Sequence, residues 1–337
     1  MIMSKIHTPK RGSRAFRPKV RAKRIYGKVK CIKQENEAKI VEFAGYKAGM
    51  TQINCLYDKK ESPIYGKKTM MPVTIIEVPD LNVAGFRCYE RKETGVAVYK
   101  DFLNINKNSE LKRKTIISKK DISLKDKDMK DIEQKISLDE IEDIKLIVYT
   151  QPHETGNAKK KPELFEVFIG GNSIEDKFAL AKEKTGKTIS INDFIEDGAF
   201  IDVIGVTKGK GFAGSVKRWG VTLLAKKSQK VIRKAGTLGP WHPAKTQATV
   251  PQMGQMGFFN RVLYNLRVLK IIGKDSTDEV FEKIKKKPFK KYGIVKSSYI
   301  IVKGSVTGPA KRMIRMRKSI RNIKGEYDGN ISVKYID

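Results

Sequence analysis

Residues 207–274 read TKGKGFAGSVKRWGVTLLAKKSQKVIRKAGTLGPWHPAKTQATVPQMGQMGFFNRVLYNLRVLKIIGK, and the rest of the chain is organised around them. The stretch carries fourteen Lys and Arg and contains no Asp or Glu. No side chain inside it can neutralise this charge, so a folded segment of this kind needs a polyanion from outside. The alternative, a solvated charged face, normally mixes both signs.

The composition indicates a folded, strongly basic protein. Of 337 residues, 39% are hydrophobic, which is enough for a core in one large or two ordinary domains. Lys and Arg number 70 against 37 Asp and Glu, giving a formal net charge of +33. A membrane surface would attract this charge, but we find no run of eighteen apolar residues and no amphipathic basic helix. Nucleic acid is the expected partner.

Metal, disulfide and secretory chemistry are not indicated. The three cysteines lie far apart, and the three histidines have no ligand spacing. We therefore expect no cofactor and no metal. The basic N-terminus is not followed by an apolar signal segment, so we expect an intracellular, cytoplasmic protein.

Residues 1–38 are predicted to form a basic N-terminal extension. Residues 1–33 hold twelve Lys and Arg, no acid, and too little apolar surface to fold alone. We expect this extension to order against phosphates, with Phe16 and Tyr26 available to stack on bases. A flexible solubilising or localisation tail is the alternative. The expected RNA contacts are Arg11, Arg14, Arg17, Lys19, Arg21, Lys23 and Arg24.

Short β patterns define the predicted core, residues 39–80 and 187–337. Residues 40–58 and 71–79 alternate or run apolar as strands do. The pattern resumes at residues 189–207, with a hairpin-type turn signal at Asp197-Gly198. Four later runs, YNLRVLKII, YGIVKS, SYIIVKGSV and NISVKYI, have the spacing of a barrel or sandwich.

Residues 80–187 are predicted to be an α/β insertion, so the fold class is mostly β with an α/β insertion. From Asp101 to Lys145 there are eleven acids and eleven bases, and this balance needs no polyanion. Residues 123–137 and 173–186 have helical spacing, the second ending at a glycine. LIVYTQP and LFEVFIGG, at 146–152 and 164–171, are predicted strands.

Residues 207–265 are predicted to form a basic central finger within the core. GKGFAG at 209–214 fits a dinucleotide-binding fingerprint, but neither an amphipathic helix nor an acid follows it. These glycines more plausibly let the backbone approach a phosphate backbone. The expected RNA contacts in the finger are Lys208, Lys210, Lys217, Arg218, Trp219, Lys226, Lys227, Lys230, Arg233, Lys234, Trp241, His242, Lys245 and Arg261.

The two tryptophans of the finger differ in their neighbours. Trp241 lies in GTLGPWHPAK between turn-forming residues, which predicts a loop tip where the indole stacks on a base. A satellite core under the loop is the alternative. The sequence does not decide whether Trp219 packs within the protein or contacts RNA. His242 has no carboxylate or nucleophile nearby in the segment, so we expect a polar contact with RNA and no catalysis.

A basic C-terminal segment is predicted at residues 304–324. Its expected RNA contacts are Lys311, Arg312, Arg315, Arg317, Lys318 and Arg321, within an acid-free range, residues 283–325. Three separate acid-free regions imply phosphate contacts on several faces. A folded RNA surrounding the protein fits this better than a DNA duplex beside it.

With these residues in view, the chain resembles the L-three family of universal large-subunit ribosomal proteins, in its archaeal and eukaryotic form. The likeness covers most of the chain and is weakest at 80–187. It rests on FAGYKAGMTQI at 43–53, PVTIIEV at 72–78, VIGVTKGKGFAGSVKRWG at 203–220, GPWHPAKTQATVPQMGQMGFFNR at 239–261 and VKGSVTGPAKRMIRMRKSIR at 302–321.

The resemblance implies a structural, non-enzymatic role in translation. It implies a translation-protein-type β-barrel core with long basic extensions that run towards the peptidyl transferase centre, Trp241 and His242 standing at the finger tip. The implied partners are large-subunit rRNA, neighbouring large-subunit proteins and, indirectly, translation factors. Eukaryotic members have a histidine where this chain has Gln229, so modification of that histidine is not expected. The end at Asp337, without a long basic tail, favours an archaeal member.

Two rival functions make different predictions. An RNA-modifying enzyme would hold a cofactor in a pocket near Gly209–Gly214. A DNA-architectural protein would bind a duplex tightly as the isolated chain. Neither explains the basic extension and the proline-bracketed tryptophan together.

Overall fold

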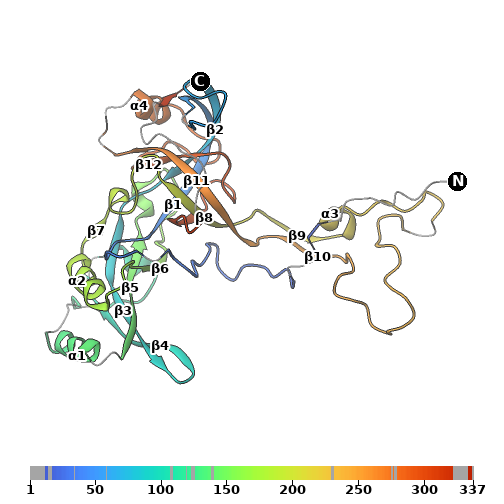
Figure 1. Ribbon diagram of the computed structural model, residues 1–337. Coiled ribbons are helices and arrows are strands. Elements are labelled where there is room, and N and C mark those ends of the chain that lie inside the picture. The colour runs from blue at the N-terminus through green and yellow to red at the C-terminus, as the bar shows by residue number, and fades with distance from the viewer. Residues whose placement is uncertain are drawn as a thin grey trace. The chain divides into compact units, whose positions relative to one another are not determined.

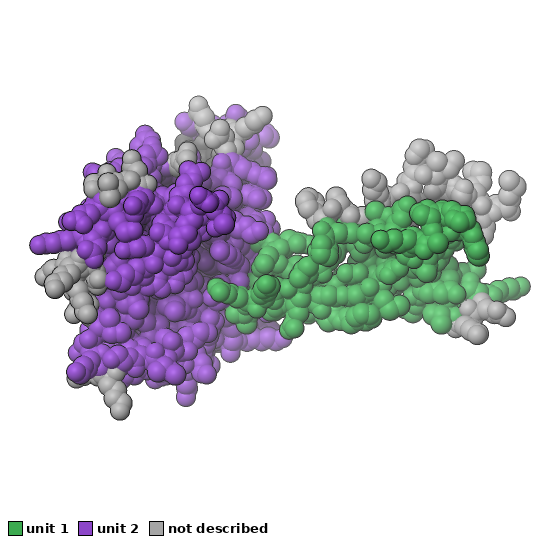
Figure 2. All heavy atoms as spheres, turned by 90° about the horizontal axis from the view of Figure 1, so that it is seen from below, with its two compact units in different colours: residues 1–25, 206–261 green, residues 26–205, 262–337 purple. Residues whose placement is uncertain are grey.

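The computed structural model describes residues 12–13, 17–33, 35–57, 59–106, 109–118, 120–122, 126–137, 140–228, 231–274, 276, 279–321 and 333–335. The chain divides into two compact units. Unit 1 comprises residues 1–25 and 206–261, and unit 2 comprises residues 26–205 and 262–337, coloured green and purple in Figure 2.

Unit 2 contains a seven-stranded antiparallel sheet with the order β13-β8-β11-β12-β2-β1-β14. Because β13 also pairs with β1, the pairing of β1, β2, β12, β11, β8 and β13 returns to its first strand. The prediction that the protein is mostly β is confirmed. The strands are β1 (Glu42–Leu56), β2 (Lys68–Glu77), β8 (Phe200–Val206), β11 (Asn260–Ile272), β12 (Tyr299–Lys303), β13 (Met313–Lys318) and β14 (Val333–Tyr335) (Figure 1).

Several of these strands are buried without alternation. Residues 42–48 of β1 and residues 313–317 of β13 are buried at every position. Strands covered on both faces have such continuous burial. One hydrophobic cluster joins side chains of the seven-stranded sheet, such as Phe43 and Val203, with side chains of a second sheet, such as Phe86. Unit 2 therefore has a single main core.

The second sheet lies within the predicted insertion and has the order β4-β3-β5-β6, with β7 also paired to β3. Helix α2 (Ile174–Lys184) packs against β5 and β3 (Figure 1). Its Phe178 and Ala181 side chains are buried. Its first turn is capped by Ser173, and Gly186 follows with φ +82°. The strands are β3 (Leu81–Lys92), β4 (Gly95–Leu103), β5 (Ile141–Thr150), β6 (Leu164–Phe168) and β7 (Thr188–Ile189).

Both helices expected in the insertion are present, as α1 (Asp126–Ser137) and α2. The strands expected near 146–152 and 164–171 are β5 and β6. The long β3–β4 hairpin was not predicted, because its mixed charges hide the apolar alternation. Unit 2 also contains α4 (Glu279–Lys286) and short 3-10 helices at Glu110–Arg113, Pro152–Glu154 and Ile191–Asp193.

Two predicted features of the core are wrong. Residues before the Asp197-Gly198 turn form the 3-10 helix Ile191–Asp193 and not a hairpin strand. YGIVKS at 292–297 is also not a strand. The backbone N–H groups of Lys296 and Ser297 point to a carboxylate instead of a neighbouring strand.

That carboxylate belongs to Glu77, which is fully buried at the end of β2. Its oxygens accept hydrogen bonds from Lys296 N (2.7 Å), Ser297 N (2.9 Å), Ser297 Oγ (3.1 Å), Gly156 N (3.1 Å) and the Tyr292 hydroxyl. Burial and the Glu77 charge raise the pKa of Tyr292, so this phenol stays a donor. A Cβ at Gly156 would meet the Ile294 carbonyl oxygen at 1.8 Å, so only glycine fits there. Glu77 thus joins three distant segments.

We expect Glu77→Gln to destabilise the protein by about 2–4 kcal/mol, because the amide nitrogen would face N–H donors inside the core. Urea unfolding of the purified chain measures this change. Glu61→Gln is the matched control, since Glu61 forms an exposed pair with Lys59, and its effect should stay within about 0.5 kcal/mol. Equal stability of the Glu77 variant and the wild type would contradict this role.

Candidate nucleic-acid interface

Unit 1 is built on a two-stranded sheet and a short helix. β9 (Gly209–Ala213) pairs antiparallel with β10 (Gly254–Gly257), and α3 (Ser215–Trp219) follows β9. Gly257 has φ +72°, and a Cβ there would meet the Lys208 carbonyl oxygen at 2.1 Å. Glycine at this position is therefore required for the close approach of the two chain segments.

The GKGFAG segment does not form a dinucleotide-binding loop. Residues 209–213 are extended as β9, and the following helix has only five residues. The fingerprint needs its glycines in a tight turn between a strand and a helix that packs on the sheet, and this extended segment forms no such turn. The strand–turn–helix with which an RNA-modifying enzyme would hold a cofactor is therefore not formed here.

Trp219 is a packing residue in the structure, which is the first of the two roles that the sequence leaves open for it. It is 4% exposed, and its Nε1–H donates to the Gln252 carbonyl at 2.7 Å. The adjacent Arg218 donates to the carbonyls of Gln252, Met253 and Gln255 at 3.0–3.3 Å. These bonds fix α3 against the chain leading into β10.

The N-terminal segment packs on this scaffold through cation–π contacts. Lys19 Nζ lies 3.9 Å and Arg17 Cζ 4.9 Å from the Trp219 ring centroid, and Arg21 Cζ lies 5.2 Å from that of Phe258. Ala22 N donates to Phe258 O at 2.8 Å. Two segments far apart in sequence therefore share one cationic surface.

Hydrophobic burial contributes little to the stability of unit 1. Its only buried hydrophobic side chains among the described residues are Val206, Ala213 and Trp219. It contains twenty Lys and Arg, nine in residues 1–25 and eleven in 206–261, and no acid. A segment with so small a core and no internal counter-charge depends on an external polyanion.

Most of the predicted contact residues of unit 1 are exposed. Arg17, Lys19 and Arg218 are half-buried, whereas Arg11, Arg14 and Lys230 lie outside the described residues. The exposed ones are Arg21, Lys23, Arg24, Lys208, Lys210, Lys217, Lys226, Lys227, Arg233, Lys234, Trp241, His242, Lys245 and Arg261.

The Trp241 side chain is 88% exposed. Its ring contacts that of His242 edge-on, with centroids 6.5 Å apart. This exposure contradicts the satellite-core alternative and leaves a bare indole among turn residues. Other large apolar side chains in the same region, Leu238 and Met253, are 49% and 61% exposed.

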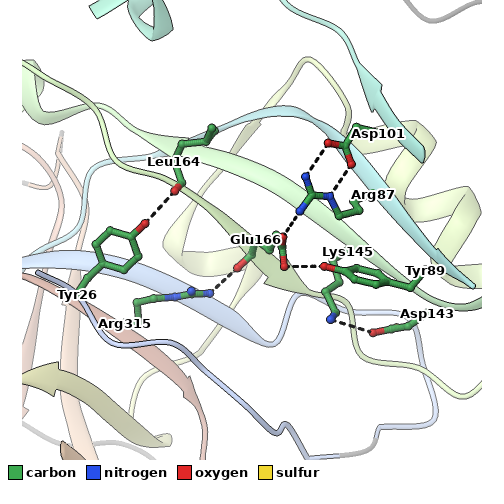
Figure 3. Close-up of polar contacts among 9 residues, drawn as sticks. All are labelled: Tyr26, Arg87, Tyr89, Asp101, Asp143, Lys145, Leu164, Glu166 and Arg315. Atoms are coloured by element: carbon green, nitrogen blue, oxygen red, sulfur yellow. Dashed lines mark hydrogen bonds and ion pairs between the residues drawn. The ribbon is translucent and has the colours of Figure 1, made fainter. Parts of the chain in front are cut away.

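The predicted basic C-terminal segment contains a core strand, β13, and two of its expected RNA contacts are wrong. Arg315 and Arg317 are 4% and 3% exposed. Arg315 forms an ion pair with Glu42 and donates to the Glu166 carbonyl at 2.5 Å (Figure 3), and Arg317 pairs with Asp202 at 3.1 Å. Both guanidinium groups compensate buried carboxylates of unit 2 and cannot reach an RNA.

Arg315 lies in a polar cluster that joins the two sheets. The Glu166 side chain on β6 accepts from Arg87 at 2.5 Å and from the Tyr89 hydroxyl at 2.8 Å, while Arg87 also pairs with Asp101 (Figure 3). Burial raises the pKa of Glu42 to about 7, although the charge of Arg315 opposes this rise. The charge of Arg315 therefore stabilises the ionised form of Glu42 in this cluster.

The remaining cations of the C-terminal segment vary in exposure. Lys311 is exposed and Arg312 is half-buried. Lys318 pairs with Glu35 at 2.9 Å. The exposed Arg321 lies over the Tyr264 ring, 3.8 Å from its centroid.

Residues 26–38 also differ from the predicted extension, because they belong to unit 2. The Tyr26 hydroxyl donates to Leu164 O at 3.1 Å (Figure 3), which leaves this ring packed and not available to stack on a base. Val29 is buried, and Arg317 donates to the Cys31 carbonyl. Phe16, the other ring expected to stack, lies outside the described residues.

Neither a metal centre nor a membrane span is found in the described part of the chain. No three or more His, Cys, Asp or Glu side chains are placed there to hold a metal ion. None of the helices that the structure describes is long and apolar enough to cross a membrane.

Comparison with known proteins identifies the family. All residues, 1–337, match the family model for ribosomal protein L3, and the chain belongs to that family. It is 42% identical to the large ribosomal subunit protein uL3 of Picrophilus torridus over 99% of this chain and 98% of the relative. The uL3 of Archaeoglobus fulgidus is 41% identical, over 98% and 97% of the two chains. Membership confirms a non-enzymatic protein of the cytoplasmic large ribosomal subunit.

We expect Arg315→Met to destabilise the protein by about 3–5 kcal/mol near pH 8, because it leaves the Glu42 carboxylate uncompensated in the core. The loss should shrink towards pH 4.5, the ordinary pKa of Glu42, since the folded protein then holds this group protonated and neutral. Urea unfolding at several pH values measures both effects.

Lys311→Met is the matched control, because it removes one exposed cation from the same segment. Its free energy of unfolding should stay within about 0.5 kcal/mol of the wild type at each pH. A pH-independent loss in the Arg315 variant would contradict the pairing with Glu42.

Proposed function

We propose that unit 1 binds large-subunit rRNA and neutralises phosphates that would otherwise repel one another as RNA helices pack. The proposal rests on the combination of twenty cations, no acid and only three buried apolar side chains among the described residues of one unit. Phosphate contacts of Lys and Arg release counterions, so such binding is strong and salt-dependent. The names of the relatives, which are large-subunit ribosomal proteins, support RNA as the polyanion.

We infer that the returning ring of strands in unit 2 is the translation-protein-type β-barrel, with residues 80–187 as its α/β insertion. The pairing of β13 with both β8 and β1 supports this assignment. In this proposal unit 2 contacts the RNA and neighbouring large-subunit proteins through its surface. Lys311, Arg312, Lys318 and Arg321 are the remaining C-terminal candidates for RNA contact.

The loop around Trp241 is proposed to be the finger tip that reaches towards the peptidyl transferase centre. The exposed indole beside His242, bracketed by Pro240 and Pro243, supports a base-stacking role. Through that position the protein would support subunit assembly and influence tRNA and factor binding. Contact with translation factors is indirect.

Sedimentation of a cell lysate tests the structural role. We expect the protein to co-migrate with large subunits in a sucrose gradient and to remain there after a high-salt wash, because RNA folded around it would retain it even when individual phosphate contacts weaken. Peripheral phosphate contacts weaken steeply with salt and would release it. Residence in the light fractions would contradict the proposal.

Trp241→Ala tests the finger tip. We expect an unchanged free energy of unfolding, because the indole is 88% exposed, and higher chemical reactivity at one rRNA base in purified subunits. The loss of stacking corresponds to about 1–3 kcal/mol. tRNA affinity of the subunits should change with it.

The neighbouring apolar residue supplies the control. Leu238→Ala removes a half-exposed side chain from the same loop without removing an aromatic ring. Wild-type base reactivity and tRNA affinity in this variant are expected. The same wild-type values in Trp241→Ala would exclude the stacking role.

A further inference from the structure

A cleft in unit 1 brings the N-terminal segment next to the chain that enters β11. It has a volume of about 370 Å³ and is lined on one side by residues of the segment 13–20 and on the other by residues 259–261. Three of its lining residues, Arg17, Lys19 and Arg261, are cations, and none is an acid. The other lining residues are Ser13, Pro18, Val20, Phe259 and Asn260.

No acid is among the residues that line this cleft, so its described wall does not neutralise the three cations. Arg17 Nε and Nη2 are buried and have no hydrogen-bond partner among the described residues. Burial lowers the pKa of Lys19, and the charges of Arg218, Arg261 and Arg17 lower it further. A buried guanidinium without an acceptor is unfavourable, and like charges at this distance repel.

Trp219 orients these cations but cannot neutralise them. Its ring has Lys19 on it at 3.9 Å and Arg17 at 4.9 Å, and cation–π attraction is weaker than pairing with an anion. Arg218, which also contacts the ring, is held by backbone carbonyls of residues 252, 253 and 255. The capacity to bind an anion therefore belongs to Arg17, Lys19 and Arg261.

We propose that this cleft binds one phosphate group of an RNA backbone, shared by Arg17, Lys19 and Arg261, and that this phosphate fastens the N-terminal segment to residues 259–261. The proposal rests on the proposed rRNA binding and adds a discrete subsite to it. A phosphate suits the site because its oxygens can accept from two segments at once, whereas stacking bases would need an open aromatic face. Among the nearby rings, the indole of Trp219 is buried, and the Phe259 ring that lines the cleft has Arg261 over it, 5.5 Å from its centroid.

The number of phosphates that the protein neutralises can be measured from salt dependence. The full chain is titrated with purified large-subunit rRNA at several salt concentrations, and log K is plotted against log salt. The slope falls by about 0.7–0.9 for each phosphate that a variant no longer neutralises. Arg17→Gln and Arg261→Gln should each lower it by at most that amount. Because Arg17 and Arg261 share one phosphate with Lys19, the double variant should neutralise at most one phosphate fewer than the wild type, and not two.

Two exposed cations outside the cleft, Lys226 and Lys245, supply the matched control. Lys226→Gln and Lys245→Gln make the same charge change, and their effects on the slope should add in the double variant. Arg17→Lys keeps the charge over Trp219 and should retain the wild-type slope. This variant separates the effect of charge from that of packing in the N-terminal segment. Thermal unfolding checks that each variant is folded.

The outcomes separate this proposal from the function on which it rests. Additive effects on the slope in the Arg17/Arg261 pair, or no effect at all, would overturn the shared subsite while leaving rRNA binding intact. Wild-type protein that binds rRNA without salt dependence would overturn both. Phosphate-ethylation interference tests the subsite independently. Ethylation of one phosphate should weaken binding of the wild type, and should weaken binding of the double variant less.

Discussion

The separation of acidic from basic side chains constrains the whole structure. Unit 1 has twenty Lys and Arg and no acid, so all 37 acids and the other 50 Lys and Arg lie in unit 2. Unit 2 can balance much of its own charge inside a folded core. Unit 1 cannot, because no rearrangement of its own side chains would bring an anion to its cations. The charge of unit 2 is therefore balanced largely within the protein, whereas the charge of unit 1 needs an anion from outside.

In unit 2, buried charges connect segments that are distant in sequence. Glu77 links β2 to Gly156 and to residues 292–297 through N–H and hydroxyl donors. Arg315 links β13 to β1 and β6, and Arg317 links β13 to β8 and to the chain at Cys31. Hydrophobic packing alone tolerates shifts between two sheets, whereas a hydrogen-bonded ion pair is satisfied in one arrangement. We infer that these groups contribute to the specificity of the fold more than to its net stability.

Structure can be predicted from this sequence where a local pattern determines it, and not where a distant partner does. Apolar alternation predicts β1, a β-branched run predicts β2, and helical spacing predicts α2. The cations of β13 were interpreted as surface residues because Glu42 and Asp202, which compensate them, lie more than a hundred residues away. Trp219 and Trp241 both lie among cations. Turn residues predicted the exposure of Trp241, but the burial of Trp219 depends on Gln252, which no local signal indicates.

Because the core of unit 1 is small, the stability of its ordered form depends on ligand binding. Ordering a residue opposes folding by about 1–2 kcal/mol in backbone entropy. The three buried apolar side chains among the described residues of unit 1 cannot offset this for so many residues. A ligand that binds only the ordered form stabilises it in proportion to the logarithm of its concentration over the dissociation constant. The cation–π contacts around Trp219 preorganise part of the cationic surface. They therefore lower the entropic cost of ordering this surface when RNA binds. Loss of a cation should therefore reduce stability in unit 2, where the cation compensates a buried acid, and reduce RNA affinity in unit 1, where it does not.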